Sequence, residues 1–464
     1  MRICNVAITD DEYMSLYYHI KYGYLSIFTT GNPNLDWTAN NHVLNSLCMK
    51  LGMTVFGEYD WAVRWQCAVA FVMSYWFIWK IISSFTNNAW RVSIYLSVFF
   101  LNAYLLEFFA LARGYCIAIA GWSMATYFFL KFCEKNKKRT LVLCLVGLFI
   151  SVYGNFSAVY FLILFGFAIM FEIYKNKKLP DAGIRFLILI GGYVLITGII
   201  ALPLLHTLKS TEISSGGSDS LFKDYLVSYI DQYINFNWRI KKSETIGWGN
   251  LLQKEIYAVG ICIIWVLIQF FSWRILSNKS IKRVQTQTLF QTVGLIILFK
   301  IFYAAFHTPF PINRSALLFS FPMILCGVVG FERIAQRYKY IQLSFLFLVP
   351  FLLWHSFMCF NTKYSIEWWR AGDAKEVLKY VKDAYTTDVT IKPITIGAEG
   401  MQFCGLAFYG ETIYKNKIKI NWRSINDNET DDFLFVPKDM KERGVKNYTP
   451  VADFYRGSLL KKIK

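Results

Sequence analysis

The sequence predicts an all-α protein that crosses a membrane many times and ends in a small α/β domain. Of its 464 residues, 55% are hydrophobic and only 17% are charged, whereas about a quarter of the residues of a soluble domain are charged. Apolar runs near or above the length needed to cross a hydrocarbon core of roughly 30 Å recur along the chain. After Phe360 the composition changes to patterns typical of a domain outside the membrane.

Hydropathy predicts about ten spans between residues 61 and 360. The fourth is the weakest, because only the segment "YGNFS" separates it from the fifth and the two could form one re-entrant hairpin. The predicted spans are residues 61–83, 89–111, 114–131, 140–154, 156–173, 184–205, 255–273, 288–306, 315–332 and 341–360.

Basic connections between the spans give the orientation, because Lys and Arg collect in the cytoplasmic loops of multi-span proteins. The same rule accounts for the net charge of +18 better than nucleic-acid binding does, so we expect no nucleic-acid partner. The basic connections occupy alternate loops, at residues 131–139, 174–178, 277–283 and 332–340. Counting spans then assigns five regions to the outer side: residues 1–60, the "ARGY" turn, residues 206–254, the "HTPFPINRS" turn and the tail after residue 360.

This layout divides the chain into three regions. Residues 1–60 are a first outer loop with interfacial helices, residues 61–360 are the transmembrane helical domain, and residues 361–464 are a small extracytoplasmic α/β domain. In the last region "AGDAKEVLKYVKDAY" has helical spacing, while "VTIKPITIG", "DDFLFVP" and "KNYTPVADFY" are typical of strands. Residues 1–60 are assigned to the outer side, yet "MRICNVAI" is too short for a span or a signal peptide. We therefore expect a helix upstream of the first loop, and the alternative is an N-terminus that crosses by an unusual route.

The ten cysteines lie mostly inside apolar runs, without a CxxC pair or metal-ligand spacing. We therefore expect them to be small core residues, and the sequence shows no ligand set that would establish a metal site. It also contains no nucleotide-binding glycine loop.

Four groups of polar residues are assigned to the outer side. Ionisable groups at membrane depth are functional candidates, because burying them is costly. The groups are Asp11 and Glu12, which follow Asp10; Asn41 and His42 in "NNHVLN"; Glu107, Arg113 and Tyr115 in "EFFALARGY"; and His307 and Arg314 in "HTPFPINRS".

Each group also has a purely structural interpretation. Glu12 could complement a helix start, a single interfacial His is commonly hydrogen-bonded within the fold, and an Arg at a span end often extends to lipid phosphates. The functional interpretation gains weight because acids and arginines from distant parts of the chain are assigned to one side. Together they suit the transfer of a sugar from a phosphate carrier, which needs a base for the acceptor's proton and cations for the departing phosphate.

The stretch "DDEYMSLYYHIKYG…NNHVLNSLCMKLGMTVFGEYDWAVRW" resembles the first outer loop of the GT-C glycosyltransferases, in particular the protein O-mannosyltransferase and lipid A aminoarabinose-transferase group. In that group an Asp-Glu pair opens the loop, a "PPL" or "HPPL" element follows, and "FG…W..R" leads into the next helix. The "ARGY" and "P.NRSALLFSFP" turns are similar to elements of bacterial relatives, whereas "HVL" departs from the pattern by replacing the prolines. The matching positions are Asp11, Glu12, His42, Val43, Leu44, Phe56, Gly57, Trp61 and Arg64.

The resemblance implies a GT-C-like, inverting hexosyl- or pentosyltransferase in the bacterial inner (plasma) membrane, with its C-terminal domain on the extracytoplasmic side. Its donor would be a polyprenyl-phosphate-linked sugar, and its acceptor would be a lipid, a glycan or a protein. It would also contact membrane lipids. Some relatives bind a divalent metal ion. Asp11 would be the general base with Glu12 beside it, and Arg113 and Arg314 would bind the donor phosphate. The residues expected to position substrate are His42, Asn41, Glu107, Tyr115 and His307.

Two other functions stay open on the sequence. A transporter or flippase of lipid-linked saccharide predicts charged residues along a path in mid-span and two similar halves, whereas here the acids gather at one interface and no repeat is clear. An O-antigen ligase or polymerase would share the substrates and concentrates its function in a large late outer loop. Residues 206–254 could supply such a loop.

Overall fold

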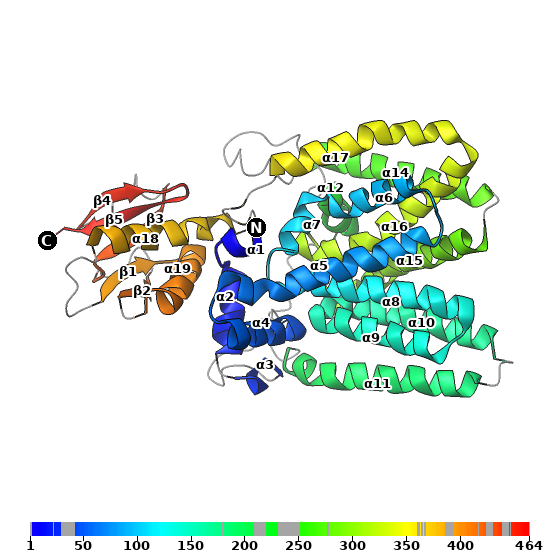
Figure 1. Ribbon diagram of the computed structural model, residues 1–464, viewed down its shortest axis with the longest axis horizontal. Coiled ribbons are helices and arrows are strands. Elements are labelled where there is room, and N and C mark those ends of the chain that lie inside the picture. The colour runs from blue at the N-terminus through cyan, green and yellow to red at the C-terminus, as the bar shows by residue number, and fades with distance from the viewer. Residues whose placement is uncertain are drawn as a thin grey trace.

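The computed structural model describes residues 2–21, 23–28, 42–177, 181–207, 220–230, 251–275, 278–359, 362, 365, 368–385, 393–415, 417–423, 430–438, 445 and 447–463. A bundle of long helices occupies one end of the molecule and a sheet domain the other, with short N-terminal helices between them (Figure 1). The predicted fold class, an all-α membrane-type bundle followed by a small C-terminal α/β domain, is confirmed.

Seven helical segments of the described part are long and apolar enough to cross a membrane. They are formed by α5 (Asp60–Ser83), α8 (Tyr115–Lys135), η2 (Phe156–Ala158) with α10 (Val159–Lys175), α14 (Leu251–Arg274), α15 (Lys279–Phe306), α16 (Arg314–Arg337), and η5 (Lys339–Ser344) with α17 (Phe345–Cys359).

The other three predicted spans are also helical, with differences. The single span predicted at 89–111 is wrong: the chain forms α6 (Ala89–Phe100) and α7 (Ala103–Phe108), because the Asn102 side chain caps α7 by accepting a hydrogen bond from the Leu105 N–H (3.1 Å). The fourth span is α9 (Lys138–Gly154), a helix of 17 residues that ends before α10 begins. The sixth is α11 (Ala182–Thr207).

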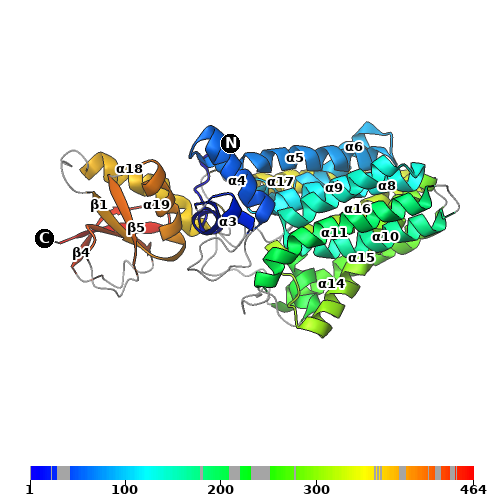
Figure 2. The ribbon, with the colours of Figure 1, turned by 90° about the horizontal axis from the view of Figure 1, so that it is seen from below.

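Successive long helices run in opposite directions, so their connections gather at the two ends of the bundle (Figures 1 and 2). The connections predicted to be basic lie at the end remote from the sheet domain. The N-terminal helices, the turn before α8 and the turn before α16 lie at the end near it. The structure therefore groups the described parts of these predicted outer regions at one end.

Helices α8 and α9 pack closely because small residues face each other. A Cβ placed on Gly121 would lie 2.3 Å from the Ser151 backbone nitrogen and 2.6 Å from the Gly147 carbonyl oxygen. The Ser151 hydroxyl also donates a hydrogen bond to the Ala118 carbonyl across the contact (2.8 Å). Small residues allow transmembrane helices to approach this closely.

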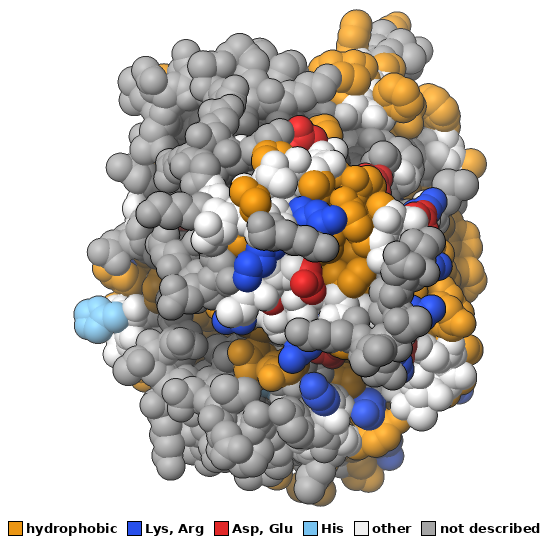
Figure 3. All heavy atoms as spheres, turned by 90° about the vertical axis from the view of Figure 1, so that its left-hand side faces the viewer, with side chains coloured by type: hydrophobic (Ala, Val, Ile, Leu, Met, Phe, Trp, Pro, Cys, Tyr) orange, Lys and Arg blue, Asp and Glu red, His pale blue; other side chains and the backbone are white. Residues whose placement is uncertain are grey.

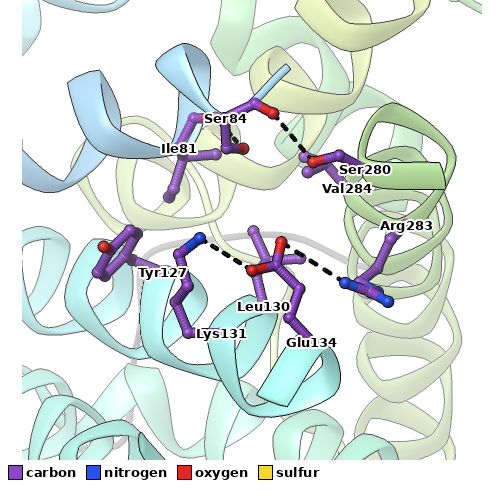
Figure 4. A pocket seen from close by; sticks show the side chains of 9 residues that line it. All are labelled: Ile81, Ser84, Tyr127, Leu130, Lys131, Glu134, Ser280, Arg283 and Val284. Carbon is purple, nitrogen blue, oxygen red and sulfur yellow. Dashed lines mark hydrogen bonds and ion pairs between the residues drawn. The ribbon is translucent and has the colours of Figure 1, made fainter. Parts of the chain in front are cut away.

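A small cavity of about 10 Å³ lies between α5, α8 and α15 at the end remote from the sheet domain (Figure 4). Glu134 accepts a hydrogen bond from Lys131 (2.9 Å) and pairs with Arg283 (3.5 Å), and the Ser280 hydroxyl donates to the Ser84 carbonyl (3.0 Å). The cavity has room for about one water molecule, so we assign these residues to helix packing.

Short elements link the bundle and the sheet domain. The N-terminal ones are α1 (Arg2–Asn5), α2 (Asp10–Ser15), the π-helix η1 (Leu16–Ile20), α3 (Leu25–Phe28) and α4 (Val43–Phe56). In the 206–254 region, η3 (Phe222–Leu226) and α12 (Val227–Ile230) lie against the start of α16, where the Asn313 N–H donates to the Ser228 hydroxyl (2.8 Å).

The C-terminal domain contains helices beside a five-stranded sheet. Strand β1 is parallel to β2 and β3, while β5 is antiparallel to β3 and β4, giving the order β2-β1-β3-β5-β4. The parallel pair of β1 and β2 needs a crossover, which α19 provides. The elements are η6 (Trp369–Asp373), α18 (Ala374–Tyr385), β1 (Ile394–Ala398), α19 (Gly400–Thr412), β2 (Ile418–Trp422), β3 (Phe433–Pro437), β4 (Tyr448–Asp453) and β5 (Gly457–Lys462).

Figure 3 views this domain end-on and shows Lys and Arg side chains spread among hydrophobic ones over the described part of the face. Basic side chains therefore occur at this end of the molecule as well as in the connections at the other end.

The α8–α9 contact predicts that Gly121→Leu destabilises the protein, because the added side chain would meet backbone atoms of α9 that cannot move independently. Such overpacking costs roughly 1–3 kcal/mol or more. We expect a lower thermal midpoint of the detergent-purified protein. Gly191→Leu in α11 is the matched control, since a Cβ there meets nothing within 4 Å. Equal midpoints for the two variants would contradict the proposed packing.

Candidate active site

The carboxylate of Asp11 lies between two guanidinium groups. Its Oδ2 is 2.9 Å from Arg113 Nη2 and 2.8 Å from Arg314 Nη1. The three side chains come from α2, the turn before α8 and the first turn of α16. Asp11 and Arg113 are buried, whereas the Arg314 side chain is 37% exposed. The structure therefore brings together the predicted base and both predicted phosphate-binding residues.

A tryptophan from the start of the C-terminal domain completes this group. The centroid of the Trp368 ring is 5.2 Å from Arg314 Cζ and 5.9 Å from Arg113 Cζ, within the range of cation–π attraction. The ring is buried, with 3% of its surface exposed. Sequence reasoning missed Trp368, because a single Trp after the last span carries no sign of which residues it meets.

Glu12, next to Asp11, is saturated with hydrogen bonds. Its Oε1 accepts from Arg64 Nε (2.7 Å) and from the Ala112 N–H (2.7 Å), and its Oε2 accepts from Arg64 Nη2 (2.5 Å) and from the N–H and hydroxyl of Thr9 (3.0 Å each). Burial alone would raise the pKa of the Glu12 carboxyl, but the Arg64 charge and these hydrogen bonds hold it below its usual value. Glu12 is therefore an ionised residue of the fold, with no oxygen directed at the Asp11 group.

The same network fixes the turn that carries Arg113. Besides the bond from the Ala112 N–H to Glu12, the Ala112 carbonyl accepts from Asn45 Nδ2 (2.8 Å), and the Leu111 carbonyl accepts from the Cys67 thiol (3.2 Å). Three side chains from three segments thus hold two successive peptide groups. Their effect is to direct the Arg113 side chain toward Asp11.

His42 is buried beside this turn, with its ring 5.6 Å from that of Tyr115. Gly114, with a φ of +72°, allows the approach, because a Cβ there would lie 2.8 Å from His42 Cβ. Burial and the charges of Arg113 and Arg314 hold the pKa of the His42 imidazole well below its usual range, so the ring is neutral at neutral pH. Its Nε2 has no hydrogen-bond partner among the described residues.

The structure also describes two other predicted residues, Glu107 and His307. Glu107 pairs with Arg2 (3.4 Å) and accepts a hydrogen bond from the Ser365 hydroxyl. His307 is exposed at the end of α15, in the left-handed conformation that ends the helix. Asn41 lies outside the described residues.

The three consecutive acids face three different partners. Asp10 accepts a hydrogen bond from the Cys404 thiol (2.6 Å), and burial raises the pKa of its carboxyl against the opposing effect of that bond. Asp11 faces its two arginines, and Glu12 faces Arg64. They do not converge as one set of metal ligands. Nor does the described part of the chain contain a group of three or more His, Cys, Asp or Glu that could hold a metal ion.

Comparisons with known proteins give a family-model match and similar solved structures. The family model described as "Dolichyl-phosphate-mannose-protein mannosyltransferase" matches residues 43–198. Two similar solved structures are those of ArnT from Cupriavidus metallidurans. The apo structure is 11% identical in sequence and has a TM-score of 0.43, and the match covers 98% of this chain and 94% of ArnT. The structure bound to undecaprenyl phosphate is 9% identical and has a TM-score of 0.42, and the match covers 99% of this chain and 94% of ArnT. No curated protein matches the sequence.

The family match confirms the predicted resemblance over a segment that includes α4, α5 and the turn carrying Arg113. The segment thus contains Arg64, the partner of Glu12.

The buried Glu12–Arg64 pair predicts a specific pattern of stabilities. Glu12→Gln or Arg64→Met alone leaves an uncompensated buried charge, which typically costs about 3–5 kcal/mol. The double variant should lose less stability than the sum of the two single losses, because each substitution removes the charge that the other substitution leaves unpaired. Thermal unfolding of the purified variants measures this coupling.

Asp181→Asn provides the control, since Asp181 makes a 3.2 Å pair with Lys138 in which both side chains are well exposed, and such pairs contribute little. Single losses no larger than the control's would contradict the structural role of the buried pair.

Proposed function

We propose that the protein is an integral-membrane glycosyltransferase that moves a sugar from a polyprenyl-phosphate donor to an acceptor hydroxyl. The observation that carries the proposal is the contact of one carboxylate, Asp11, with two guanidinium groups from distant parts of the chain. The match of residues 43–198 to a family named for dolichyl-phosphate-mannose supports a sugar linked to a lipid phosphate as the donor.

In this proposal Asp11 is the general base. The acceptor hydroxyl attacks the anomeric carbon from the side opposite the phosphate, its proton passes to the Asp11 carboxylate, and the bond from the anomeric carbon to the phosphate oxygen breaks. The polyprenyl phosphate leaves with the electron pair of that bond. A single displacement of this kind inverts the anomeric configuration, for either a hexose or a pentose.

The two arginines have different proposed duties. Arg113 is buried and held by its turn, so it supplies a fixed positive charge. Arg314 is more exposed and can turn its planar fork of donors to the phosphate oxygens. Both stabilise the charge that develops on the departing phosphate. Trp368 holds the two guanidinium groups in place from one side.

Other residues act around this group. His42, neutral and with Nε2 unbonded among the described residues, is proposed to position substrate beside Tyr115. Glu12 is proposed to position Asp11 and the Arg113 turn, since its oxygens already accept five hydrogen bonds. The roles of Glu107 and His307 in positioning substrate stay predictions.

We place the enzyme in the bacterial plasma (inner) membrane, with the Asp11 group and the C-terminal domain on the extracytoplasmic side. Support comes from the basic connections at the opposite end of the bundle, which the positive-inside rule assigns to the cytoplasm. The acceptor would be a lipid, a glycan or a protein that reaches this side.

Asp11→Asn removes the base, and Arg314→Ala removes the exposed phosphate ligand. We expect each to slow turnover by about 10²–10⁴-fold, the range for loss of a general acid or base, with Arg314→Ala toward the lower end. The measurement is the accumulation of unused polyprenyl-phosphate sugar in membrane lipid extracts, by mass spectrometry, at equal protein level.

Two further variants sharpen this test. Asp181→Asn is a matched control at the other end of the bundle, where Asp181 pairs with Lys138 (3.2 Å), and should behave as wild type. Asp10→Asn tests the neighbouring acid. Normal turnover in Asp11→Asn together with lost turnover in Asp10→Asn would assign the role of base to Asp10. Normal turnover in all three variants, Asp11→Asn, Asp10→Asn and Arg314→Ala, would end the enzymatic proposal.

Trp368→Leu should weaken binding of the carrier phosphate, because two cation–π contacts that hold the arginines are lost. A combined loss of about 1.4 kcal/mol corresponds to a roughly tenfold rise in Kd. Undecaprenyl phosphate titrated into the purified protein is the probe. Trp273→Leu, which removes a Trp–Arg contact at the far end of the bundle, should leave Kd unchanged. An unchanged Kd in Trp368→Leu would remove this assignment.

A further inference from the structure

The segment before α2, which leads to Asp11, contacts the C-terminal domain through Tyr409 of α19. The Tyr409 hydroxyl accepts a hydrogen bond from the Ile8 N–H (2.9 Å) and donates one to Asp60 Oδ1 at the start of α5 (3.0 Å). Tyr409 is 1% exposed and Ile8 is fully buried. One hydroxyl thus joins the sheet domain, the bundle and the backbone three residues before the proposed base.

Two more side chains of the domain hold the same region. Lys375 pairs with Asp60 and donates to the Cys4 and Asn5 carbonyls (3.2 Å each). The Cys404 thiol donates to Asp10. The domain therefore contacts the chain on both sides of Ile8.

The segment from Val6 to Thr9 has no regular secondary structure, so side chains from elsewhere determine where it lies. From the bundle, Arg64 donates to the Val6 carbonyl (2.7 Å) and the Ala7 carbonyl (3.0 Å). From the sheet domain, the Tyr409 hydroxyl accepts a hydrogen bond from the Ile8 N–H, which belongs to the same peptide group as the Ala7 carbonyl. Removing either contact frees one side of the segment.

We propose that Tyr409 is a positioning residue for the transfer reaction, through which the docked C-terminal domain fixes the location of the Asp11 carboxylate. The inference rests on the proposed function, in which Asp11 takes the acceptor's proton. Catalytic groups must be held within about 0.5 Å of their productive positions, and a misplacement of about 1 Å can slow a reaction about a hundredfold. The C-terminal domain is thus part of the catalytic unit, in addition to any part it has in binding the acceptor.

Tyr409→Phe in the full-length protein tests the proposal, because it keeps the ring and removes only the hydroxyl. We expect faster amide hydrogen exchange in the peptide containing Ile8, and turnover of polyprenyl-phosphate sugar in membranes reduced roughly 10- to 100-fold. The Kd for undecaprenyl phosphate should stay within about twofold of wild type, because the hydroxyl bonds to Ile8 and Asp60, and the proposed phosphate ligands are other residues. A purely structural role would not separate turnover from binding in this way.

Tyr448→Phe is the matched control. Its hydroxyl is also buried and donates to the Asp431 carbonyl (2.6 Å), inside the same domain and away from Ile8. It should leave exchange at Ile8 and turnover unchanged. If Tyr409→Phe does not accumulate in membranes, Lys375→Met removes contacts of the same segment and is expected to give the same three results.

Wild-type turnover in Tyr409→Phe, or equal losses in Tyr409→Phe and Tyr448→Phe, would overturn the inference. These outcomes are distinct from failure of the proposed function, which would appear as normal turnover in Asp11→Asn, Asp10→Asn and Arg314→Ala together. An inactive Asp11→Asn together with a fully active Tyr409→Phe would reject the positioning role alone.

Discussion

The arrangement of the candidate site depends on one ion pair, between Glu12 and Arg64, in which neither side chain is exposed to solvent. Burying two charges is costly, and the cost is offset only when geometry and hydrogen bonding are complete. Here the carboxylate accepts five hydrogen bonds, and the guanidinium also donates to backbone carbonyls of residues 3, 6 and 7. The pair therefore joins the N-terminal segment, α5 and the turn at Ala112 into one unit.

This pair explains how three consecutive acidic residues contact three different sets of partners. Successive residues of a helix point about 100° apart, so once Glu12 is directed at Arg64, its neighbours must face elsewhere. Asp11 faces the two arginines, and Asp10 faces Cys404 of the C-terminal domain. The Glu of the Asp-Glu pair that opens the loop thus sets the direction of its Asp. In the proposed mechanism, Glu12 is therefore as necessary to the site as Asp11.

Sequence reasoning predicted the parts of this site that follow from topology. Alternating basic connections assign Asp11, Arg113 and Arg314 to one side, and the structure brings these residues into contact. It also predicted the regions of α18, β1, β3 and β4 from their spacing. It did not predict α19, β2 or β5. Strands of five or six residues carry weak patterns, and α19 is apolar on most of its surface because it packs between the sheet and α2.

Residues whose role depends on a distant partner were also missed. Arg64 was noted only as part of a motif, Trp368 gave no signal, and Tyr409 lies 401 residues from the peptide group it contacts. Periodicity reports which face of an element is buried, and charge reports which side of a membrane a loop occupies, but neither identifies the partner across a tertiary contact. The break between α6 and α7 has a similar cause, because hydropathy continues through Asn102 while its side chain caps a new helix.

The site lies where three parts of the chain meet, and each part supplies what the others lack. The bundle provides Arg113 and Arg314 at the ends of rigid helices, the N-terminal segment provides Asp11, and the C-terminal domain provides Trp368 and Tyr409. Each of these groups is held by side chains of another part. A membrane bundle can fix charges at its end but offers little irregular backbone there, because unsatisfied peptide groups are costly near lipid. The protein resolves this constraint by carrying the proposed base, Asp11, on a separate segment, which the folded C-terminal domain holds in place.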